Sequence, residues 1–218
     1  MTNINYNFIE EYIRDNIIYT DEKLIEMRKY ADEFHVPIVE PETEEFIKFL
    51  ISVSKPKRIL ELGTAIGYSS ISFAKFSKRI ELIDTVEIRE EMADIAKKNI
   101  QDENLEDIIK VHLLDAYDYL LDCDKKYDLI FIDAAKGQYE KYFNEALKNL
   151  DKNGIIICDN VLFKGMVANQ ELVKRRKKTI VKRLRTFLKD MKREEEFVTS
   201  IVPIGDGVLL VREKDEED

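Results

Sequence analysis

The chain is poor in cysteine and histidine, with two of each among 218 residues. Cys123 and Cys158 lie far apart in the sequence, and the histidines are His35 and His112. A disulfide-stabilised small domain and a zinc site with soft ligands both need more of these residues than the chain has. Any metal ion bound here is therefore expected to have oxygen ligands.

Long hydrophobic runs and an N-terminal targeting segment are also missing. No window approaches about eighteen uninterrupted apolar residues, and residues 1–16 show no basic stretch followed by an apolar one. We therefore expect a cytoplasmic protein with no membrane partner. With 44% hydrophobic residues, the chain can bury one sizeable core. We expect one structural domain, with a helical N-terminal cap at 1–53, a core at 54–212 and an acidic tail at 213–218.

Short apolar segments rich in Ile, Leu and Val recur along the core, at 58–62, 80–87, 109–114, 127–133 and 154–160. Helical patterns lie between them, for example at 89–101 and 138–150. Continuous apolar strands that alternate with helices indicate a parallel sheet covered on both faces. Two later strands joined around 205–207 indicate an antiparallel hairpin at the edge of the sheet. The pattern predicts a doubly wound α/β fold with a mostly parallel, seven-stranded sheet.

The N-terminal cap shows apolar residues at helical spacing, which predict two helices within 6–34 and a third at 42–53. Pro37 and Pro41 favour an extended link before the third helix. That helix is expected to bury one apolar face, formed by Phe46, Phe49, Leu50 and Val53.

A loop with two glycines follows the first predicted strand, in the stretch ELGTAIGYS at 61–69. Gly63 and Gly67 allow a tight turn and close approach of the backbone to a ligand. Their spacing is not that of the dinucleotide fingerprint, so a pyrophosphate ligand is disfavoured. Glu87 ends the second strand, where an acid can accept both ribose hydroxyls, and Asp115 follows the third, near a possible adenine amino group. An ordinary turn or a helix cap would explain each feature equally well.

Two further predicted strands end at aspartates. Asp133 ends the fourth strand in FIDAAKGQY, and Asp159 ends the fifth, followed directly by Asn160 in DNVLFKG. Open parallel sheets bind ligands beyond the carboxyl ends of their strands, so these side chains are expected to meet. Three hard oxygen donors suit Mg²⁺, although turn residues and a cap would show the same pattern. Lys136 is then a candidate general base for a hydroxyl group, or else a surface lysine at a helix start.

Together these motifs resemble those of the class I S-adenosylmethionine-dependent O-methyltransferases of the catechol and caffeoyl-CoA type. The similarity covers nearly the whole chain and is strongest at 36–165 and 203–211. Within that family, LGTAIGYS, FIDAAKGQY and DNVLFKG are most similar to the bacterial tRNA 5-hydroxyuridine methyltransferases. A departure is Leu62, where the family has isoleucine. The resemblance implies a Rossmann-like methyltransferase core at 54–212.

The resemblance also implies the cofactors S-adenosylmethionine and Mg²⁺, and a homodimer. Asp133, Asp159 and Asn160 would bind the metal ion, and Lys136 would be the catalytic base. The cofactor site would be formed by residues at the strand ends and before the third helix: Val39, Glu61, Gly63, Gly67, Tyr68, Ser69, Glu87, Asp115, Ala116 and Asp133.

A basic segment interrupts an otherwise acidic chain of net charge −9. Residues 164–193 contain twelve Lys or Arg and two acidic residues, a local charge of +10. Part of this segment is predicted to be a helix with an inward apolar stripe, formed by Val181, Leu184, Leu188 and Met191. Its basic face suits nucleic acid phosphates, although a solvated helix face would show the same pattern. The residues expected to contact RNA are Lys164, Arg175, Arg176, Lys178, Lys182 and Arg185.

We therefore predict methylation of the 5-hydroxyl of 5-hydroxyuridine at the wobble position of a tRNA anticodon, giving 5-methoxyuridine. The alternative is a small-molecule O-methyltransferase of the catechol or caffeoyl-CoA type, because a catechol also presents two adjacent oxygens to a metal ion. A third hypothesis is a non-catalytic RNA-binding protein on the same scaffold. The intact set of Asp133, Lys136, Asp159 and Asn160 speaks against that third hypothesis.

Overall fold

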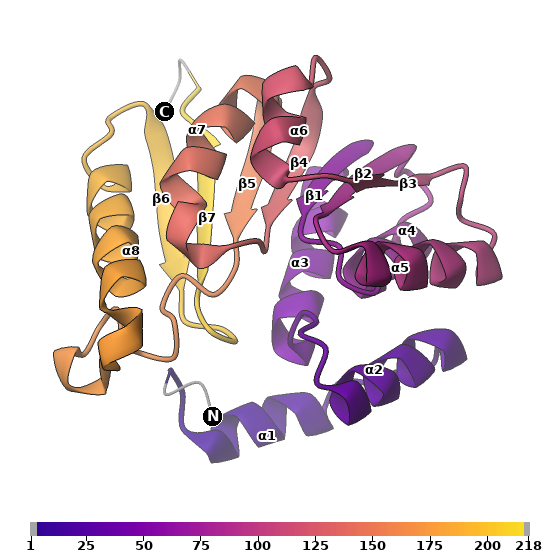
Figure 1. Ribbon diagram of the computed structural model, residues 1–218, viewed down its shortest axis with the longest axis horizontal. Helices are drawn as coiled ribbons and strands as arrows, with labels where there is room; N and C mark the ends of the chain where they lie inside the picture. Colours follow the sequence, from indigo (N-terminus) through magenta and orange to yellow (C-terminus); the bar gives the residue numbers. More distant parts are fainter. Residues whose placement is uncertain (1–3, 216–218) are drawn as a thin grey trace.

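The computed structural model describes residues 4–215, which fold around one sheet of seven strands. The strands are β1 (Arg58–Leu62), β2 (Leu82–Glu87), β3 (Ile109–Leu113), β4 (Tyr127–Ile132), β5 (Leu150–Cys158), β6 (Phe197–Val202) and β7 (Val208–Glu213). Their order across the sheet is β3-β2-β1-β4-β5-β7-β6 (Figure 1). β1 to β5 pair in parallel, whereas β7 is antiparallel to both β5 and β6. The order reverses between β1 and β4, where open α/β sheets bind their ligands.

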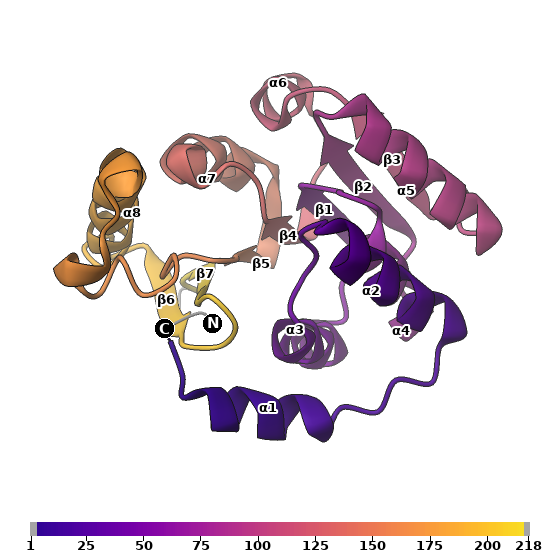
Figure 2. The ribbon, with the colours of Figure 1, turned by 60° about the horizontal axis from the view of Figure 1, so that its bottom comes forward.

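Helices cover both faces of this sheet (Figures 1 and 2). They are α1 (Asn7–Asp15), α2 (Glu22–Phe34), α3 (Pro41–Ser54), α4 (Tyr68–Phe76), α5 (Glu90–Asp102), α6 (Ala116–Asp122), α7 (Tyr139–Asn149) and α8 (Lys178–Met191). Short 3-10 helices lie at η1 (Lys136–Gln138), η2 (Gln170–Leu172) and η3 (Arg175–Lys177). No helix within residues 4–215 is long and apolar enough to cross a membrane.

Two hydrophobic clusters fill the space between the sheet and its helices. Alternate strand residues point to opposite faces, so Leu60 and Ile130 pack with α6, α7 and α8, whereas Ile59 and Leu129 pack with α2 to α5. These strands are buried on both faces, which explains why they are continuous apolar runs rather than alternating ones.

The predicted fold class is confirmed. Each of the five predicted parallel strands is present, and the later pair forms the antiparallel β6 and β7 with its turn at 203–207. β5 begins earlier than predicted, at Leu150. The predicted tail at 213–218 begins inside β7, and residues 216–218 lie outside the described part of the chain. The division at 53 and 54 stays a prediction.

The predicted inward face of α3 is wrong in part. Phe49 and Val53 are each 63% exposed, whereas Ile47 and Ile51 are fully buried. The buried stripe also contains Glu44, whose side chain is held in a polar cluster. Apolar residues lie on more than one face of this helix, so an apolar pattern alone does not determine its rotation.

α1 lies at the edge of the molecule beside α3, well away from the sheet (Figure 2). Its predicted helical period is correct, but its large apolar residues face outward, with Phe8 66% and Tyr12 70% exposed. The inner face is polar instead. Glu10 is buried, and Arg14 forms ion pairs with Glu40 and Glu42 at the start of α3.

Candidate active site

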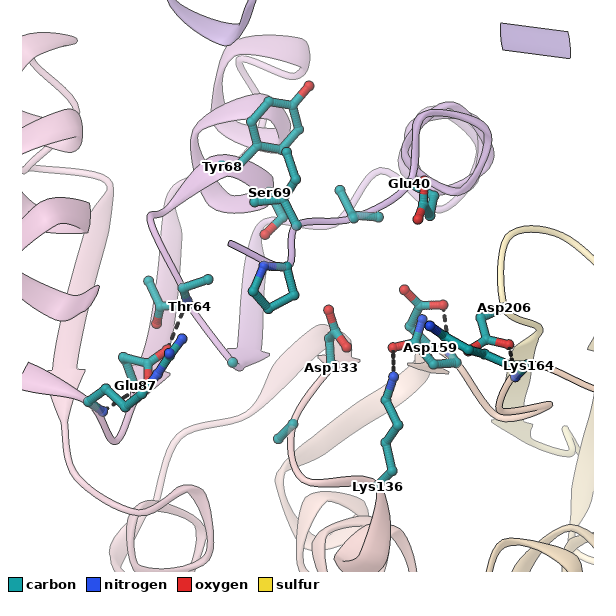
Figure 3. Close-up of a pocket in the computed structure, with 18 residues that line it drawn as sticks. Glu40, Thr64, Tyr68, Ser69, Glu87, Asp133, Lys136, Asp159, Lys164 and Asp206 are labelled. Atoms are coloured by element: carbon teal, nitrogen blue, oxygen red, sulfur yellow. Dashed lines mark hydrogen bonds and ion pairs between the residues drawn. The ribbon is translucent and has the colours of Figure 1, made fainter. Parts of the chain in front are cut away.

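The carboxyl ends of β1, β4 and β5 open into a cavity of about 470 Å³ (Figure 3). The residues predicted from the sequence that line it are Val39, Gly63, Tyr68, Ser69, Glu87, Asp133, Lys136, Asp159, Asn160 and Lys164. A neighbouring cavity of about 320 Å³ is lined by Gly63, Glu87, Asp115, Ala116 and Asp133 among others. The two cavities share Gly63, Glu87 and Asp133, so together they form one elongated site.

The glycine loop brings its backbone against the end of β4. Gly63 has a φ of 111°, and a Cβ at this position would collide with the carbonyl oxygen of Asp133. Only glycine therefore fits this close approach. Gly67 has a φ of 82° and immediately precedes α4, where it packs against Ala96. Of the two glycines, Gly63 lines both cavities, whereas Gly67 faces α5 and lines neither.

Glu61 lies behind this loop, at 1% exposure, and not at the cavity wall that the sequence predicted. Its carboxylate accepts hydrogen bonds from the hydroxyls of Ser69, Ser70 and Thr85. Burial raises its pKa to about 7 against these hydrogen bonds. In this structure Glu61 ties β1, β2 and the start of α4 together beneath the cavity floor.

The smaller cavity has the acidic walls expected for a nucleoside. Glu87 accepts hydrogen bonds from the backbone of Ala65 and Arg89, both at 2.9 Å. Asp115 caps α6 through the backbone of Tyr117 at 2.8 Å. The interpretation of Asp115 as a helix cap is therefore correct, and Asp115 also lines the cavity. The sequence prediction missed Ile88, Gln138 and Tyr142, which also line this cavity. The position of Ile88 directly after Glu87 was a usable signal, and the structure shows this side chain to be exposed.

Asp133 and Asp159 reach the larger cavity from adjacent parallel strands, as predicted (Figure 3). Burial raises the pKa of Asp133, and the charge of Lys136 partly opposes that rise. Burial also raises the pKa of Asp159, and the nearby charge of Asp133 raises it further. The Lys136 ammonium donates a hydrogen bond to the Asn160 side-chain oxygen. These contacts bring together the four residues that the sequence singled out for the reaction.

The donor set fits a hard divalent cation. Two buried carboxylates that repel one another gain a partner when a cation sits between them, and the amide oxygen of Asn160 is a further hard donor. Among residues 4–215, no cluster contains three or more His, Cys, Asp or Glu side chains placed to hold a metal ion. Two aspartates and one amide would hold such an ion and would leave open positions for water or for oxygens of a substrate.

Asp206 is a cavity residue that sequence reasoning treated only as part of a turn. It is buried between β6 and β7, and its carboxylate accepts the backbone N–H of Lys164. Its carbonyl oxygen accepts the N–H of Leu162 at 3.0 Å. This turn therefore holds the segment after Asn160, which has left-handed backbone at Asn160, Phe163 and Lys164. The glycines on either side of Asp206 were the available signal.

The six basic residues expected to contact RNA lie in three different environments. Lys164 lines the large cavity, whereas Arg175, Arg176, Lys178 and Lys182 are exposed on η3 and α8. Arg185 is half-buried and donates to the carbonyl oxygens of Met166 and Val167 at 2.9 and 2.8 Å. It therefore anchors its own protein's backbone. The apolar stripe of α8 is buried as predicted.

Comparison with known proteins agrees with this geometry. A family model described as O-methyltransferase matches residues 15–214. A catechol O-methyltransferase of Niastella koreensis is 31% identical, with 78% of this chain and 80% of that protein covered. A caffeoyl-CoA O-methyltransferase of Populus kitakamiensis is 29% identical, with 94% and 92% covered.

Solved structures show the same relationship. An O-methyltransferase from Bacillus cereus, solved in complex with SAH (S-adenosylhomocysteine), has a TM-score of 0.82 and 29% identity, with 98% of this chain and all of that chain covered. The sheet order, the glycine loop and the acid at the end of β2 agree with a nucleoside cofactor of this kind. The chain therefore belongs to the S-adenosylmethionine-dependent O-methyltransferases of the catechol and caffeoyl-CoA type.

Proposed function

We propose that this protein methylates one hydroxyl of a small molecule with two adjacent oxygens, such as a catechol, with the help of a divalent cation. The observation that carries the proposal is the pair of buried carboxylates, Asp133 and Asp159, beside Asn160 and Lys136 in one cavity. Mg²⁺ fits this donor set. The site needs an acceptor whose oxygens can reach both the cation and the methyl group of a donor bound at the glycine loop.

Each group has a separate task in the proposed reaction. S-adenosylmethionine supplies an electrophilic methyl group on its sulfonium, and a divalent cation favours the deprotonated form of an acceptor hydroxyl. Val39, Tyr68 and Ser69 bind one part of the methyl donor, and Glu87 and Asp115 bind its ribose and adenine. Asp133, Asp159 and Asn160 hold the cation.

Lys136 completes the set. Its ammonium donates a hydrogen bond to Asn160 and lies over the ring of Phe163, 5.9 Å from the ring centroid. In its neutral form the Nζ atom would take the proton of the acceptor hydroxyl as the oxygen bonds to the methyl carbon, while the sulfonium S–C bond breaks and S-adenosylhomocysteine leaves. Alignment of the acceptor oxygen with the methyl group supplies much of the remaining rate enhancement.

The relatives favour a small molecule over RNA. Matched proteins are named for catechol and caffeoyl-CoA, and the match covers most of both chains. Glu40 and Asp206 line the cavity (Figure 3), together with Arg89, Lys136 and Lys164. The wall therefore carries both signs of charge, and its carboxylates can accept hydrogen bonds from the hydroxyls of a small acceptor.

Methylation of 5-hydroxyuridine in tRNA is the second candidate, and one observation favours it. The exposed cations Lys178 and Lys182 lie on α8, which contacts η1, the segment that begins at Lys136. Arg175 and Arg176 lie on η3, which contacts α8. Arg183 of α8 donates to the carbonyl oxygen of Gly137 at 2.9 Å. A phosphate backbone held on this surface would therefore end near the catalytic residue.

The test is transfer of labelled methyl groups from S-adenosylmethionine to a catechol, to a monophenol and to tRNA containing 5-hydroxyuridine, each with and without EDTA. We expect the catechol to be methylated, the monophenol to be poor, and EDTA to abolish the reaction. Methylation of the tRNA with an inert catechol would overturn the proposal in favour of the second candidate. Turnover that is insensitive to EDTA would overturn the role of the metal ion.

A charge-reversal variant separates the two acceptors further. Replacement of Arg175, Lys178 and Lys182 by glutamate changes an exposed surface and leaves the cavity intact. We expect unchanged turnover of the catechol, because none of these side chains lines the cavity. A loss of catechol turnover would show that this surface takes part in the small-molecule reaction.

A further inference from the structure

A buried polar cluster connects the N-terminal helices to the wall of the active site. Its centre is Glu44 of α3, whose side chain is fully buried. We call this group the Glu44 cluster; its members are Tyr19, Arg28, Glu44, Lys48, Tyr68 and Ser72. Burial pushes the pKa of Glu44 upward, but hydrogen bonds from Lys48, Ser72 and Arg28 outweigh it and hold this pKa below its ordinary value. The carboxylate is therefore a charged anchor inside the protein.

Arg28 of α2 lies in this cluster between Tyr19 and Tyr68. Its guanidinium carbon lies 4.5 Å from the ring centroid of Tyr68 and 5.1 Å from that of Tyr19. Nη2 donates to Glu44 at 2.6 Å and to the carbonyl oxygen of Val39 at 3.2 Å. Nε is buried and has no hydrogen-bond partner among residues 4–215. Two aromatic rings and two hydrogen-bond acceptors thus hold the guanidinium in place, although its Nε–H makes no hydrogen bond.

Two partners of Arg28 belong to the cavity wall. Val39 and Tyr68 both line the large cavity, and Tyr68 also donates its hydroxyl to Glu44 at 2.9 Å. The extended segment before α3 and the first turn of α4 are therefore fixed to the same guanidinium. A change at Arg28 would move both of these wall elements together.

We propose that Arg28 is a positioning residue that sets the affinity of the methyl-donor site by fixing Val39 and Tyr68. The inference rests on the proposed function, which places S-adenosylmethionine against these two residues. Arginine is needed because one planar, permanently charged group must stack on an aromatic ring and donate to two acceptors at once. A lysine keeps the charge but offers neither the flat face nor the fork of donors.

The test uses the full-length protein and the product SAH as a probe. Arg28→Lys is compared with Lys23→Gln, a control on the same helix that breaks the ion pair of Lys23 with Asp102 on α5, 2.9 Å long and away from the cavity. Binding of SAH is measured by calorimetry, and steady-state kinetics give KM for each substrate. We expect Arg28→Lys to raise the SAH Kd and the KM for S-adenosylmethionine about tenfold, while kcat at saturation changes less than about twofold.

Each outcome separates a positioning role from a purely structural one. A lower melting temperature of Arg28→Lys with an unchanged Kd for SAH would overturn the inference. Equal weakening in Lys23→Gln would do the same, because that change does not touch the wall. Failure of the wild-type protein to bind SAH would instead overturn the proposed function.

A second variant covers the case in which Arg28→Lys does not fold. Tyr19 is only half-buried, so Tyr19→Leu keeps apolar bulk while it removes one of the two rings that flank the guanidinium. We expect the SAH Kd to rise two- to threefold, roughly, with an unchanged KM for the acceptor. An unchanged Kd in this folded variant would contradict the inference.

Discussion

At the scale of single residues, Asp133 and Asp159 show how the reaction conflicts with stability. Both carboxylates are raised in pKa by burial, and the charge of Asp133 adds to the rise at Asp159. Without a cation, the protein therefore carries an unfavourable pair of carboxylates at the ends of β4 and β5. Such strain is common where a site is built for a ligand.

This conflict gives a prediction for Asp159→Asn. In the presence of EDTA, the variant should melt about 2 to 5 °C higher than the wild type, because one buried charge is gone. Its methyl transfer in saturating Mg²⁺ should fall at least about a hundredfold. Thermal unfolding and turnover are measured on the same preparations. A variant that is both less stable and inactive would contradict the argument.

Lys136 gives the second prediction at this scale. Lys136→Met should lower kcat about 10² to 10⁴-fold, because the group that accepts the hydroxyl proton is lost. The SAH Kd should stay unchanged, since other residues bind the methyl donor. Lys152→Met is the matched control, because Lys152 is exposed at the far end of β5. A kcat within about threefold of the wild-type value would show that Lys136 is not the general base.

At the scale of elements, local sequence patterns predicted what lies within an element and missed what joins two elements. The strand ends at Glu87, Asp133 and Asp159 could be predicted, because parallel strands place their carboxyl ends at one edge. The glycines beside Asp206 indicate only a turn, and its contact with Lys164 could not be predicted, because Lys164 lies far away in the sequence. The hydrogen bonds from Arg185 to backbone carbonyl oxygens of its own chain were missed for the same reason. A charge pattern does not show which carbonyl oxygens lie nearby.

The rotation of α3 yields a prediction at this scale. Ile47→Ala should lower the free energy of unfolding by about 2 to 5 kcal/mol, because this side chain is fully buried. Phe49→Ala should cost less than about 1 kcal/mol, although phenylalanine is larger, because Phe49 faces outward. Urea unfolding of both variants measures the difference. Equal losses would contradict the observed rotation, and a larger loss for Phe49→Ala would mean that the predicted face is the buried one.

At the scale of the whole molecule, the outward face of α1 leads to a prediction about assembly. Tyr6, Phe8 and Tyr12 are each at least 66% exposed, and Ile18 is 87% exposed. Exposed apolar side chains of this size favour association, and the family resemblance makes a second copy of the chain the expected partner. We expect a dimer by light scattering at micromolar concentration, and a monomer for Phe8→Glu combined with Tyr12→Glu.

The control for that experiment is Glu11→Lys, which changes an exposed polar residue of the same helix. It should leave the dimer intact. A monomeric wild-type protein would contradict the prediction, and a dimer that survives both substitutions would place the interface elsewhere.

Global stability depends on a second polar centre, on the side of the sheet away from the active site. Asp84 of β2 is fully buried and accepts hydrogen bonds from His112 at 2.6 Å, Lys125 at 2.8 Å and Tyr127 at 2.8 Å. Burial raises its pKa, but these three partners outweigh burial and lower the pKa to about 2. The carboxylate therefore connects β2, β3 and the start of β4.

The sign of the pH dependence follows from this shift. The pKa of Asp84 is lower in the folded state than its ordinary value of 3.8, so the stability that it contributes is present above about pH 4 and is lost as pH falls toward 2. The shift corresponds to about 2 kcal/mol at neutral pH, of which about half is lost at pH 3. The difference in free energy of unfolding between wild type and Asp84→Asn should therefore shrink between pH 6 and pH 3. Urea unfolding across this range measures it, and a constant difference would show that the charge of Asp84 does not support the sheet.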